Sequence, residues 1–527
     1  MTKTRSRSVL TLVATASLTA LTVVALPSPG SAEEGIGLSP LASYDSGADF
    51  DSGGAEIPAY DAKSQRFFVT NGAASAVDVL ELQDGELVRV AQIDVPAVTS
   101  VAVSPKGGLL AVAVPAEVST DPGQVRTFNT RNLKARRTST VGALPDALTF
   151  TPDGKDILVA NEGEPSGYGP NAVDPEGSVS LVDAANGKVR HADFTSFNGQ
   201  RAALVGQGVR IFGPGASVAQ DLEPEFIAIT GNGSTAYVAL QENNALAVLD
   251  VASATITDIL PLGLKDHAVV GNELDASNRD EGIDIRSWPV KGMYMPDGID
   301  AYTAGGETFV VTANEGDGRD DDGFTDMARI GDDEITLDPR VFPNAEALQQ
   351  DENLGRLQFA AATSPTNAAG EFTELHTFGA RSFTIRDAAG TIVFDSGSDF
   401  EDITAEVLPE AFNSNNDDND SFDARSDDKS PEPEGIEVGQ IDDRTYAFIG
   451  LERVGGVMVY DITDPRKASF VDYVTTRVFD EPAGQGTGGD LAPEGLVFVS
   501  AEDSPTGEPL LAVSHEVSGT TTVFTLG

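Results

Sequence analysis

Ten acidic residues recur in pairs along the chain, in an arrangement that could bind a metal ion. Five segments place an acid directly after proline, in LPDAL, EPEFI, MPDGI, EPEGI and APEGL, and a second acid follows 16 to 22 residues later. The pairs are Asp146 with Glu162, Glu225 with Glu242, Asp297 with Glu315, Glu434 with Glu452, and Glu494 with Glu516. Carboxylates held together repel one another unless they take up protons or bind a cation. Ca²⁺ is bound by such oxygen ligands, so we expect these ten residues to be candidate calcium ligands.

Five basic residues accompany the acids and could hold an anion beside the metal ion. Arg319 and Arg453 follow the second acids of two pairs, Arg425 and Lys429 precede Glu434, and Arg381 lies in GARSF. Arginine offers a forked donor that fits phosphate or carboxylate. The alternative is that each basic residue pairs with a neighbouring acid, and that each acid accepts backbone hydrogen bonds in its own turn.

The composition limits which metals are suitable. The chain has no cysteine and only four histidines, which excludes disulfides, thiolate catalysis and cysteine-ligated zinc or iron–sulfur centres. Any bound metal is therefore expected to be oxygen-ligated Ca²⁺ or Mg²⁺. The sequence also contains no phosphate-binding loop, dinucleotide fingerprint or G-x-S-x-G motif, so no catalytic residue is assigned.

The net charge limits the partners. With 83 Asp and Glu against 34 Lys and Arg, the chain carries a formal charge of -49. Such a surface repels nucleic acid and anionic lipid, and it attracts divalent cations. Solvation of an acidic surface explains most of these carboxylates. We expect a monomer, with a divalent cation and an anionic small molecule or a cell-surface component as partners.

The elements that would position the acids are repeated β-strands. Seven segments share a short apolar strand, a turn rich in Gly, Asp or Asn, and a second strand of β-branched residues; they span 56–82, 100–118, 146–165, 225–251, 297–320, 434–462 and 494–526. Short strands in a recurring unit, with almost no helical periodicity outside 344–354, predict an all-β fold, a seven-bladed β-propeller. Matched positions in the blades lie at matched places around the axis, so the five acid pairs should converge on one mouth of the channel. The alternative is two packed β-domains with a boundary near 411–433.

Two features complete the predicted propeller. The segment 36–47 precedes the first repeat and is expected to supply the outer strand of the last blade, which closes the ring. A long insertion, about 320–433, interrupts blade five, and its residues 373–397 alternate like the outer two strands of that blade. Its acidic stretch, about 411–433, is expected to be a loop and is a candidate for disorder without a ligand. A shorter insertion, 163–177, decorates blade three.

The N-terminus has the pattern of a secretory signal peptide. Lys3, Arg5 and Arg7 precede the apolar segment 9–26, and small residues end at Ala32. We therefore expect cleavage after Ala32, a signal peptide at 1–32 and a single propeller domain at 33–527. The alternative is a retained N-terminal anchor. No later segment is long and apolar enough to span a membrane, and the C-terminus shows no anchor, so a secreted, extracellular protein is expected.

Several motifs resemble one family of surface proteins. GARSFTIRD, ARSDDKSPEPEGI, GLERVGGVMVYDITDP, GDLAPEGLVF and HEVSGTTTVF are similar to the bacterial choice-of-anchor I proteins, also described as mesenchyme-specific cell surface glycoprotein-like, over about residues 38–526. The resemblance implies a YVTN/WD40-like propeller on extracellular or cell-surface proteins with various C-terminal anchors. Some relatives carry fused metallophosphoesterase or 5′-nucleotidase domains, whereas this sequence shows neither an anchor nor a fused domain.

Two functions therefore remain open at this stage. The first is an extracellular calcium-binding propeller that binds a ligand or surface component without catalysis. The second is a calcium-dependent phosphoesterase, phytase- or phosphatase-like, in which the metal activates water and the basic residues hold phosphate. They differ in whether Arg319, Arg425 and Arg453 lie free beside the acids or are engaged elsewhere.

Overall fold

A computed structural model describes residues 36–527, which form one compact unit. The predicted signal peptide, 1–32, and the expected cleavage after Ala32 lie outside the described residues. Within the described part, no helix is both long enough and apolar enough to cross a membrane.

The described residues form seven four-stranded antiparallel sheets, in keeping with the predicted all-β class. The first sheet contains β2 (Pro58–Asp61), β3 (Arg66–Asn71), β4 (Ala76–Gln83) and β5 (Glu86–Asp94). The second contains β6 (Val101–Val103), β7 (Leu110–Val114), β8 (Pro122–Phe128) and β9 (Ala135–Ala143). The third contains β10 (Pro145–Phe150), β11 (Asp156–Asn161), β12 (Ser178–Asp183) and β13 (Val189–Asp193). The fourth contains β14 (Ile227–Ile229), β15 (Thr235–Leu240), β16 (Ala245–Asp250) and β17 (Thr255–Pro261).

The remaining three four-stranded sheets follow the same order. The fifth contains β20 (Ile299–Ala304), β21 (Glu307–Asn314), β27 (Ser382–Asp387) and β28 (Ile392–Asp395). The sixth contains β29 (Pro433–Ile441), β30 (Arg444–Leu451), β31 (Val457–Asp461) and β32 (Ser469–Val474). The seventh contains β33 (Pro493–Val499), β34 (Leu510–His515), β35 (Thr520–Leu526) and, from the start of the described chain, β1 (Leu38–Asp45).

Burial explains why these sequences form stacked sheets. The second strand of each sheet is buried along nearly its whole length, as in β7 and β34, whereas β5 and β9 are largely exposed. A strand buried on both faces requires another sheet against each face, and its side chains are accordingly almost all apolar. The turns supply the matching chemistry: Gly305 and Gly306 join β20 to β21 with φ of +59° and +86°, which side-chain-bearing residues rarely adopt.

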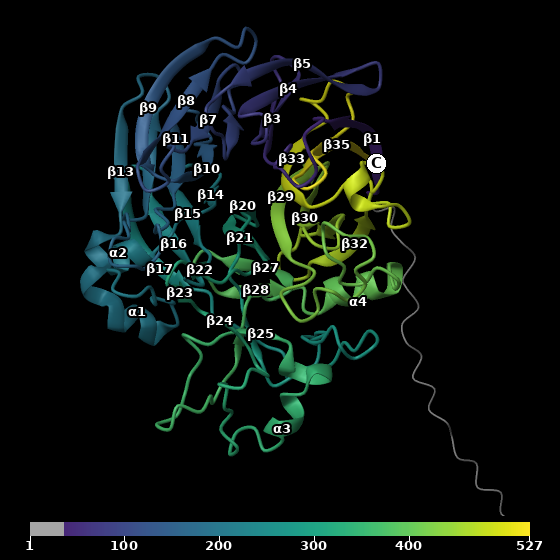
Figure 1. Cartoon of the computed structure of the whole chain (residues 1–527). Helices are drawn as coiled ribbons and strands as arrows, with labels where there is room; N and C mark the ends of the chain where they lie inside the picture. The colour runs from purple at the N-terminus through teal and green to yellow at the C-terminus, as the bar shows by residue number, and fades with distance from the viewer. Residues whose placement is uncertain (1–35) are drawn as a thin grey trace, which may run out of the picture. The chain divides into compact units, whose positions relative to one another are not determined.

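The sheets stand around a common centre (Figure 1). The first strand of each sheet contacts the first strand of the next sheet, and β33 contacts β2. In the seventh sheet β1 pairs with β35, so the two ends of the described chain lie side by side, as the sequence predicts. This arrangement is that of a propeller-like fold.

Long segments between strands form additional small elements. As predicted, 373–397 supplies β27 and β28 to the fifth sheet. Outside the four-stranded sheets lie β18 (Leu264–Asp266), β19 (Lys291–Met293), β22 (Asp320–Asp321), β23 (Phe324–Thr325), β24 (Met327–Arg329), β25 (Gln358–Ala360) and β26 (His376–Thr377). Residues 274–290 and 330–375 share a separate apolar cluster that includes Trp288, Leu337 and Phe359. The segment 264–293, whose strands β18 and β19 form a sheet with β26, therefore belongs with the insertion, a grouping that the sequence did not predict.

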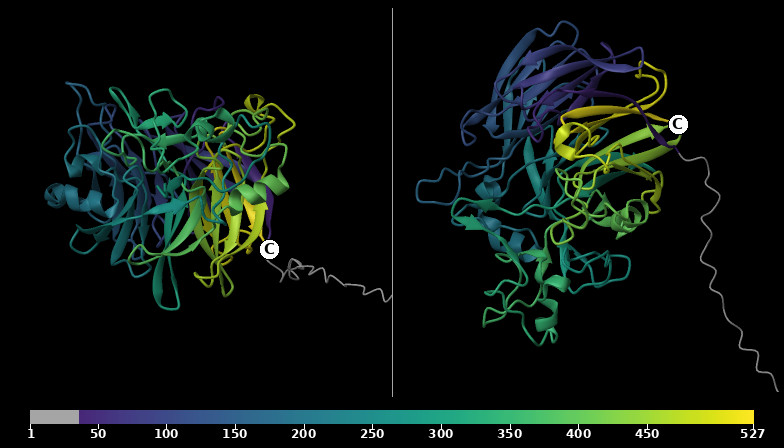
Figure 2. Two further views of the ribbon diagram at one scale, coloured as in Figure 1. Left: turned by 90° about the horizontal axis from the view of Figure 1, so that it is seen from below. Right: turned by 45° about the vertical axis from the view of Figure 1, so that its right-hand side comes forward.

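Four α-helices occur in the described chain, and only one was predicted. They are α1 (Arg201–Gln207), α2 (Val218–Asp221), α3 (Ala345–Leu348) and α4 (Asp399–Val407). The predicted helix at 344–354 forms only α3 and a following irregular turn at Asp351–Gly355. The other helices are one to three turns long, too short for a clear apolar period. The segment between β21 and β29 places most of its loops on one side of the sheets (Figure 2, left).

The acidic stretch at 411–433 is a loop, as predicted, but it packs against the rest of the molecule. Phe412, Asn413 and Asp427 are almost completely buried. Asn413 donates to Glu401 Oε1 of α4 at 2.9 Å and to Ser426 Oγ at 2.8 Å. Side-chain hydrogen bonds thus fix a segment with little apolar content, and the disorder suggested by its composition is not seen.

Candidate functional site

The hairpin pairing brings the two acids of each predicted pair to the same edge of a sheet. In three sheets the proline before the first acid lies opposite the residue before the second: Pro145 pairs with Asn161, Pro433 with Leu451, and Pro493 with His515. Because the strands are antiparallel, the start of the first strand meets the end of the second. We refer to the ten predicted acids at these edges as the acidic mouth.

The electrostatics show that the five pairs share one region. Burial raises the pKa values of Glu162, Glu225, Asp297, Glu434 and Glu494 well above their usual range, and in each case the charge of the predicted partner raises it further. Neighbouring pairs also act on each other: Asp146 and Glu494 raise the pKa of Asp297. The acids therefore converge on one side of the sheets, as the repeat alignment predicts.

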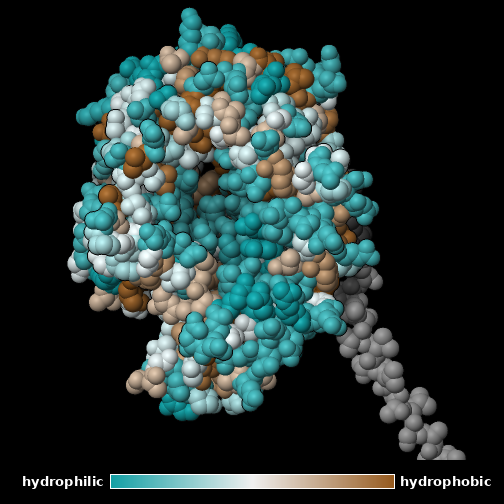
Figure 3. Space-filling view, in the orientation of Figure 1, coloured by the Kyte–Doolittle hydropathy of each residue, from teal (hydrophilic) through white to brown (hydrophobic). Residues whose placement is uncertain are grey.

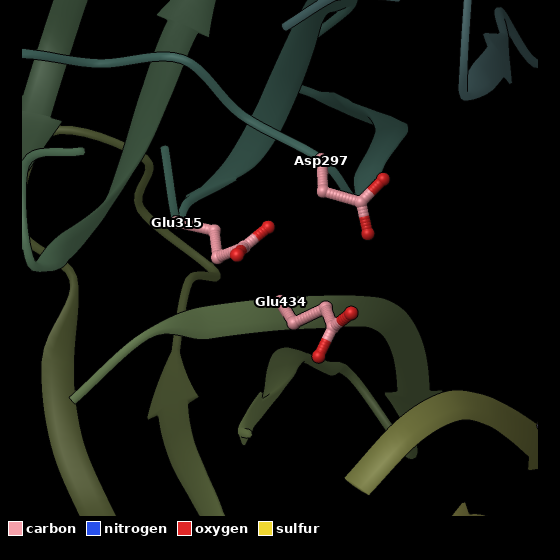
Figure 4. Close-up of side chains that lie close together, drawn as sticks. All are labelled: Asp297, Glu315 and Glu434. Carbon is pink, nitrogen blue, oxygen red and sulfur yellow. The ribbon is translucent and has the colours of Figure 1, made fainter. Parts of the chain in front are cut away.

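Three carboxylates of the acidic mouth form a compact group. One oxygen each from Asp297, Glu315 and Glu434 lies within 4.8 Å of the others. The three side chains come from the fifth and sixth sheets and point toward a shared space (Figure 4). Two ligands on opposite sides of a Ca²⁺ ion lie about 4.6–5.2 Å apart, since each Ca–O distance is about 2.3–2.6 Å. The group is therefore small enough to surround one ion.

The hydrogen bonding of this group leaves one carboxylate oxygen unsatisfied. Glu434 Oε2 is buried and has no hydrogen-bond partner among the described residues. Glu315 accepts from Gln241 at 2.9 Å and from Lys429 at 3.0 Å, which fixes its carboxylate. A buried carboxylate oxygen without a donor is costly, and a metal ion would satisfy it.

A second set of unsatisfied acids lies beside the fourth sheet. Glu225 and Glu242 are each 8% exposed, their carboxyl groups lie within hydrogen-bonding reach of each other, and both Oε2 atoms lack a donor among the described residues. Glu223 Oε1 is also buried without a partner. Glu225 and Glu242 need either protons or a cation, whereas Glu223 is paired with Arg319 through its other oxygen.

An adjacent cluster is paired with basic residues of the chain. Oxygens of Glu315, Glu432 and Glu452 also lie within 4.8 Å of one another. Lys429 lies 3.0 Å from Glu315 and 3.4 Å from Glu432, and Arg453 lies 3.0 Å from both Glu432 and Glu452. Arg425 adds a bond of 2.7 Å to Glu432. Burial alone would raise the pKa of Glu432, but these three cations hold it well below its usual range.

Arg319 and Arg381 are engaged with other acids. Arg319 lies 2.6 Å from Asp221 and 2.7 Å from Glu223, and its guanidinium lies over the Phe212 ring. Arg381 lies 2.6 Å from Glu401 of α4 and donates to three backbone carbonyls. All five predicted anion-binding residues thus form ion pairs within the protein, which is the alternative that the sequence left open.

Sequence reasoning missed several acids of this region. Glu56 lies at the start of the first repeat, which the alignment treated as lacking both acids; burial and the charge of Glu516 raise its pKa to about 7. It was overlooked because its order is Glu-Ile-Pro rather than Pro-Glu. Glu223 and Glu432 are the first acids of the two EPE motifs, so a doubled acid around proline was the signal that could have found them.

The raised pKa values predict an unusual pH dependence for the metal-free protein. Burial raises the pKa of Asp146 to about 6 and, with the charge of Glu432, that of Glu452 to about 8. In the unfolded chain these acids titrate near 4, so their stabilising contribution is complete below about pH 4 and is lost as pH rises through about 6 to 8. In the presence of a chelator, we expect the free energy of unfolding to fall between pH 5.5 and 8, by about 1.4 kcal/mol per pH unit for each proton that the folded state retains. The melting temperature should fall with it.

Thermal unfolding followed by circular dichroism at a series of pH values would measure this effect. E452Q, which removes one titrating group, should flatten the slope. A melting temperature that rises over this interval, with the same slope in E452Q, would contradict the assignment of buried protonated acids.

Comparison with known proteins gives the family. A model described as the choice-of-anchor I domain matches residues 56–465. The chain belongs to the choice-of-anchor I family. The match covers most of the chain and confirms the resemblance drawn from its motifs.

Two relatives of this choice-of-anchor I chain are animal proteins. It is 29% identical over 278 residues to the mesenchyme-specific cell surface glycoprotein of Strongylocentrotus purpuratus, covering 46% of this chain and 35% of the relative. It is also 29% identical over 189 residues to gigasin-3a of Magallana gigas, covering 34% of this chain and 66% of the relative. The matches thus span from about a third to just under two thirds of the relatives' lengths. Among solved structures, Kuenenia stuttgartiensis hydrazine synthase matches with a TM-score of 0.48 and 13% identity, over 91% of this chain and 97% of that one.

Proposed function

We propose that this choice-of-anchor I chain is a secreted, cell-surface-associated propeller that binds calcium at its acidic mouth. The seven sheets are its blades, β1 closes the ring, and the protein acts as a monomeric module that binds a surface component or ligand. The family and a relative named as a cell surface glycoprotein support the extracellular location. The pairing of β1 with β35 and the contact of β33 with β2 support the closed ring.

The calcium proposal rests on one observation above all. Asp297, Glu315 and Glu434 bring three carboxylates within 4.8 Å, and Glu434 Oε2 has no donor among the described residues. Three carboxylates leave room for the carbonyl and water oxygens that usually complete calcium coordination. The ion would offset the mutual repulsion of the mouth and hold the fifth and sixth sheets together. The other seven acids would attract the cation through their negative charge, and some would supply further ligand oxygens. Glu225 and Glu242 are the best placed of them to bind a second ion.

No observation favours the calcium-dependent phosphoesterase. A phosphate would need basic groups free to receive it, and Arg319, Arg381, Arg425, Lys429 and Arg453 each bond to carboxylates of the chain. The face in Figure 3 is hollowed near its centre, and mainly hydrophilic residues border the hollow below and to the right. We therefore propose binding rather than hydrolysis.

Calcium is expected to stabilise the folded protein against heat. Binding to the folded state alone adds about 2.7 kcal/mol when free calcium is 100 times its dissociation constant. The melting temperature should rise with calcium over the millimolar range and return on chelation. The increase should be greater at pH 8 than at pH 5.5, because fewer protons must then be displaced from the mouth.

Matched variants separate a specific site from general attraction to an acidic surface. D297N/E434Q should lose most of the calcium-induced shift, whereas D84N/E410Q, which alters two exposed acids, should keep it. An unchanged melting temperature at 5 mM calcium would refute the proposal. An equal shift in both double variants would assign calcium to the surface at large.

A further inference from the structure

A cavity of about 400 Å³ lies at the centre of the sheets, directly inside the acidic mouth. The first strands, or the residues directly before them, of all seven four-stranded sheets contribute to its wall. This volume falls in the range of small-molecule binding sites, about 300–1,000 Å³. The calcium site proposed above shares only Asp297 with the lining of this cavity.

The titratable side chains of the cavity wall are all acids. Its lining contains five carboxylic acids and, among the described residues, no lysine, arginine or histidine. The acids occupy two levels. Asp146, Asp297 and Glu494 belong to the acidic mouth, while Asp300 and Glu437 lie three residues further along their strands from Asp297 and Glu434. Three residues of extended chain span up to about 10 Å.

The deeper acids are held in place by neighbouring strands. Asp300 of β20 accepts a hydrogen bond from Val438 N of β29 at 3.0 Å. Glu437 of β29 accepts one from Phe498 N of β33 at 3.1 Å through Oε1. These bonds orient both carboxyl groups, and the backbone amides that form them bring no positive charge.

The wall is mixed: apolar residues contribute to it beside the acids, and polar atoms make up the larger part of its surface. Val101, Leu148, Ile227, Ile299, Ile436 and Leu496 all contribute to the wall. The apolar part of the wall favours hydrocarbon over water, by about 0.8 kcal/mol for each methylene group buried against it. A hydrated metal ion would gain nothing from it, whereas an organic cation with a methylene chain would.

A nearby acid also lacks a donor. Glu225 is 8% exposed, and its buried Oε2 has no hydrogen-bond partner among the described residues. Burial raises the pKa of Glu225, and the charges of Glu242, Glu162 and Asp297 raise it further. Glu225, which is not itself part of the cavity wall, thus places an unsatisfied acceptor beside the wall residues Phe226 and Ile227. An ammonium group supplies three donors and a positive charge.

We propose that the central cavity binds a linear aliphatic diamine or polyamine. One terminal ammonium group lies among the carboxylates of the mouth, the second lies between Asp300 and Glu437, and the methylene chain contacts the apolar wall between them. The two levels select a separation of up to about 10 Å between ammonium groups. The proposed ligand is thus a cation, whereas the sequence analysis considered an anionic ligand.

Calorimetric titration with spermidine and with 1,8-diaminooctane tests this proposal. The titration is done in 150 mM NaCl with chelator, so that calcium is absent and general attraction to the acidic surface is screened. We expect one molecule bound per chain. The double variant D300N/E437Q should weaken binding at least tenfold, because a hydrogen bond to a charged group contributes about that much or more. The monoamine n-octylamine should also bind at least tenfold more weakly.

Two controls make the outcome decisive. D84N/E410Q should bind the diamine as the wild type does. D300N/E437Q should retain its far-ultraviolet circular dichroism and its cooperative thermal unfolding, which shows that it folds. Absence of binding to the wild type, several molecules bound per chain, or equal affinity in D300N/E437Q would each overturn the proposal, whatever the result with calcium.

Discussion

Replacing Arg319 with alanine is expected to lower the free energy of unfolding by about 3–5 kcal/mol. Arg319 is 5% exposed and bonds to Asp221 and Glu223, which are themselves 1% and 2% exposed. Its removal leaves Glu223 buried with no basic partner and Asp221 with only Arg201, at 3.3 Å. It also detaches the start of the long insertion from the segment that precedes β14.

Chemical denaturation of R319A and of a matched control would measure this loss. Arg136 of β9 is an exposed arginine, so R136A should change stability by no more than about 0.5 kcal/mol. R319K should lie between the two, because lysine keeps the charge but not the forked pair of bonds. If R319A were as stable as R136A, Arg319 would be available for a ligand, as the phosphoesterase hypothesis required.

The variant E432Q is expected to lower the free energy of unfolding by a similar amount, about 3–5 kcal/mol, because it removes a buried anion rather than a buried cation. Glu432 is completely buried and receives bonds from Arg425, Lys429 and Arg453. Glutamine keeps the shape of the side chain but leaves three largely buried cations with less compensating charge. The loop that ends at β29 should loosen, which hydrogen exchange of residues 411–432 would detect.

A double-mutant cycle identifies the interaction. The double variant E432Q/K429M removes one cation together with the anion. Its decrease in the free energy of unfolding should therefore be smaller than the sum of the decreases in E432Q and K429M. E410Q, which alters an exposed glutamate, should be within about 0.5 kcal/mol of the wild type. Strict additivity in the cycle, with a small loss in E432Q, would show that the three cations do not depend on Glu432.

The sequence was sufficient to predict the framework of the acidic mouth. The repeated Pro-acid motif and the acid after the second strand are local features, and hairpin pairing alone brings Asp297 near Glu315. Repetition then brings Glu434 from the next sheet, because equivalent positions lie side by side around a common centre. The strand of residues 36–47 was predictable because the last repeat supplies three strands, which leaves the outer strand of its blade to the segment before the first repeat.

The partners of the basic residues could not be predicted, because they depend on how irregular segments fold. Arg425, Lys429 and Glu432 lie within eight residues of one another, but Arg453 reaches Glu432 only because 411–432 packs beside β30. Arg319 bonds to residues nearly a hundred positions earlier. Arg381 pairs with Glu401 of α4, a helix too short for its period to be recognised.

These pairings divide the acidic mouth into two chemically different parts. Around Glu432, the basic residues of the chain compensate the carboxylates. Around Asp297 and Glu434, and again around Glu225 and Glu242, carboxylate oxygens remain without donors among the described residues. The net charge of the chain does not distinguish these parts. Only the second has buried carboxylate oxygens without donors, and Glu315, which bonds to Lys429, lies in both.

Diffraction from crystals grown in calcium, recorded at a wavelength at which calcium scatters anomalously, tests the central claim most directly. We predict an anomalous peak within about 2.3–2.6 Å of carboxylate oxygens from Asp297, Glu315 and Glu434, and its absence from crystals of D297N/E434Q. Well-diffracting wild-type crystals with no peak among these three residues, or with calcium only at exposed acids, would contradict the account.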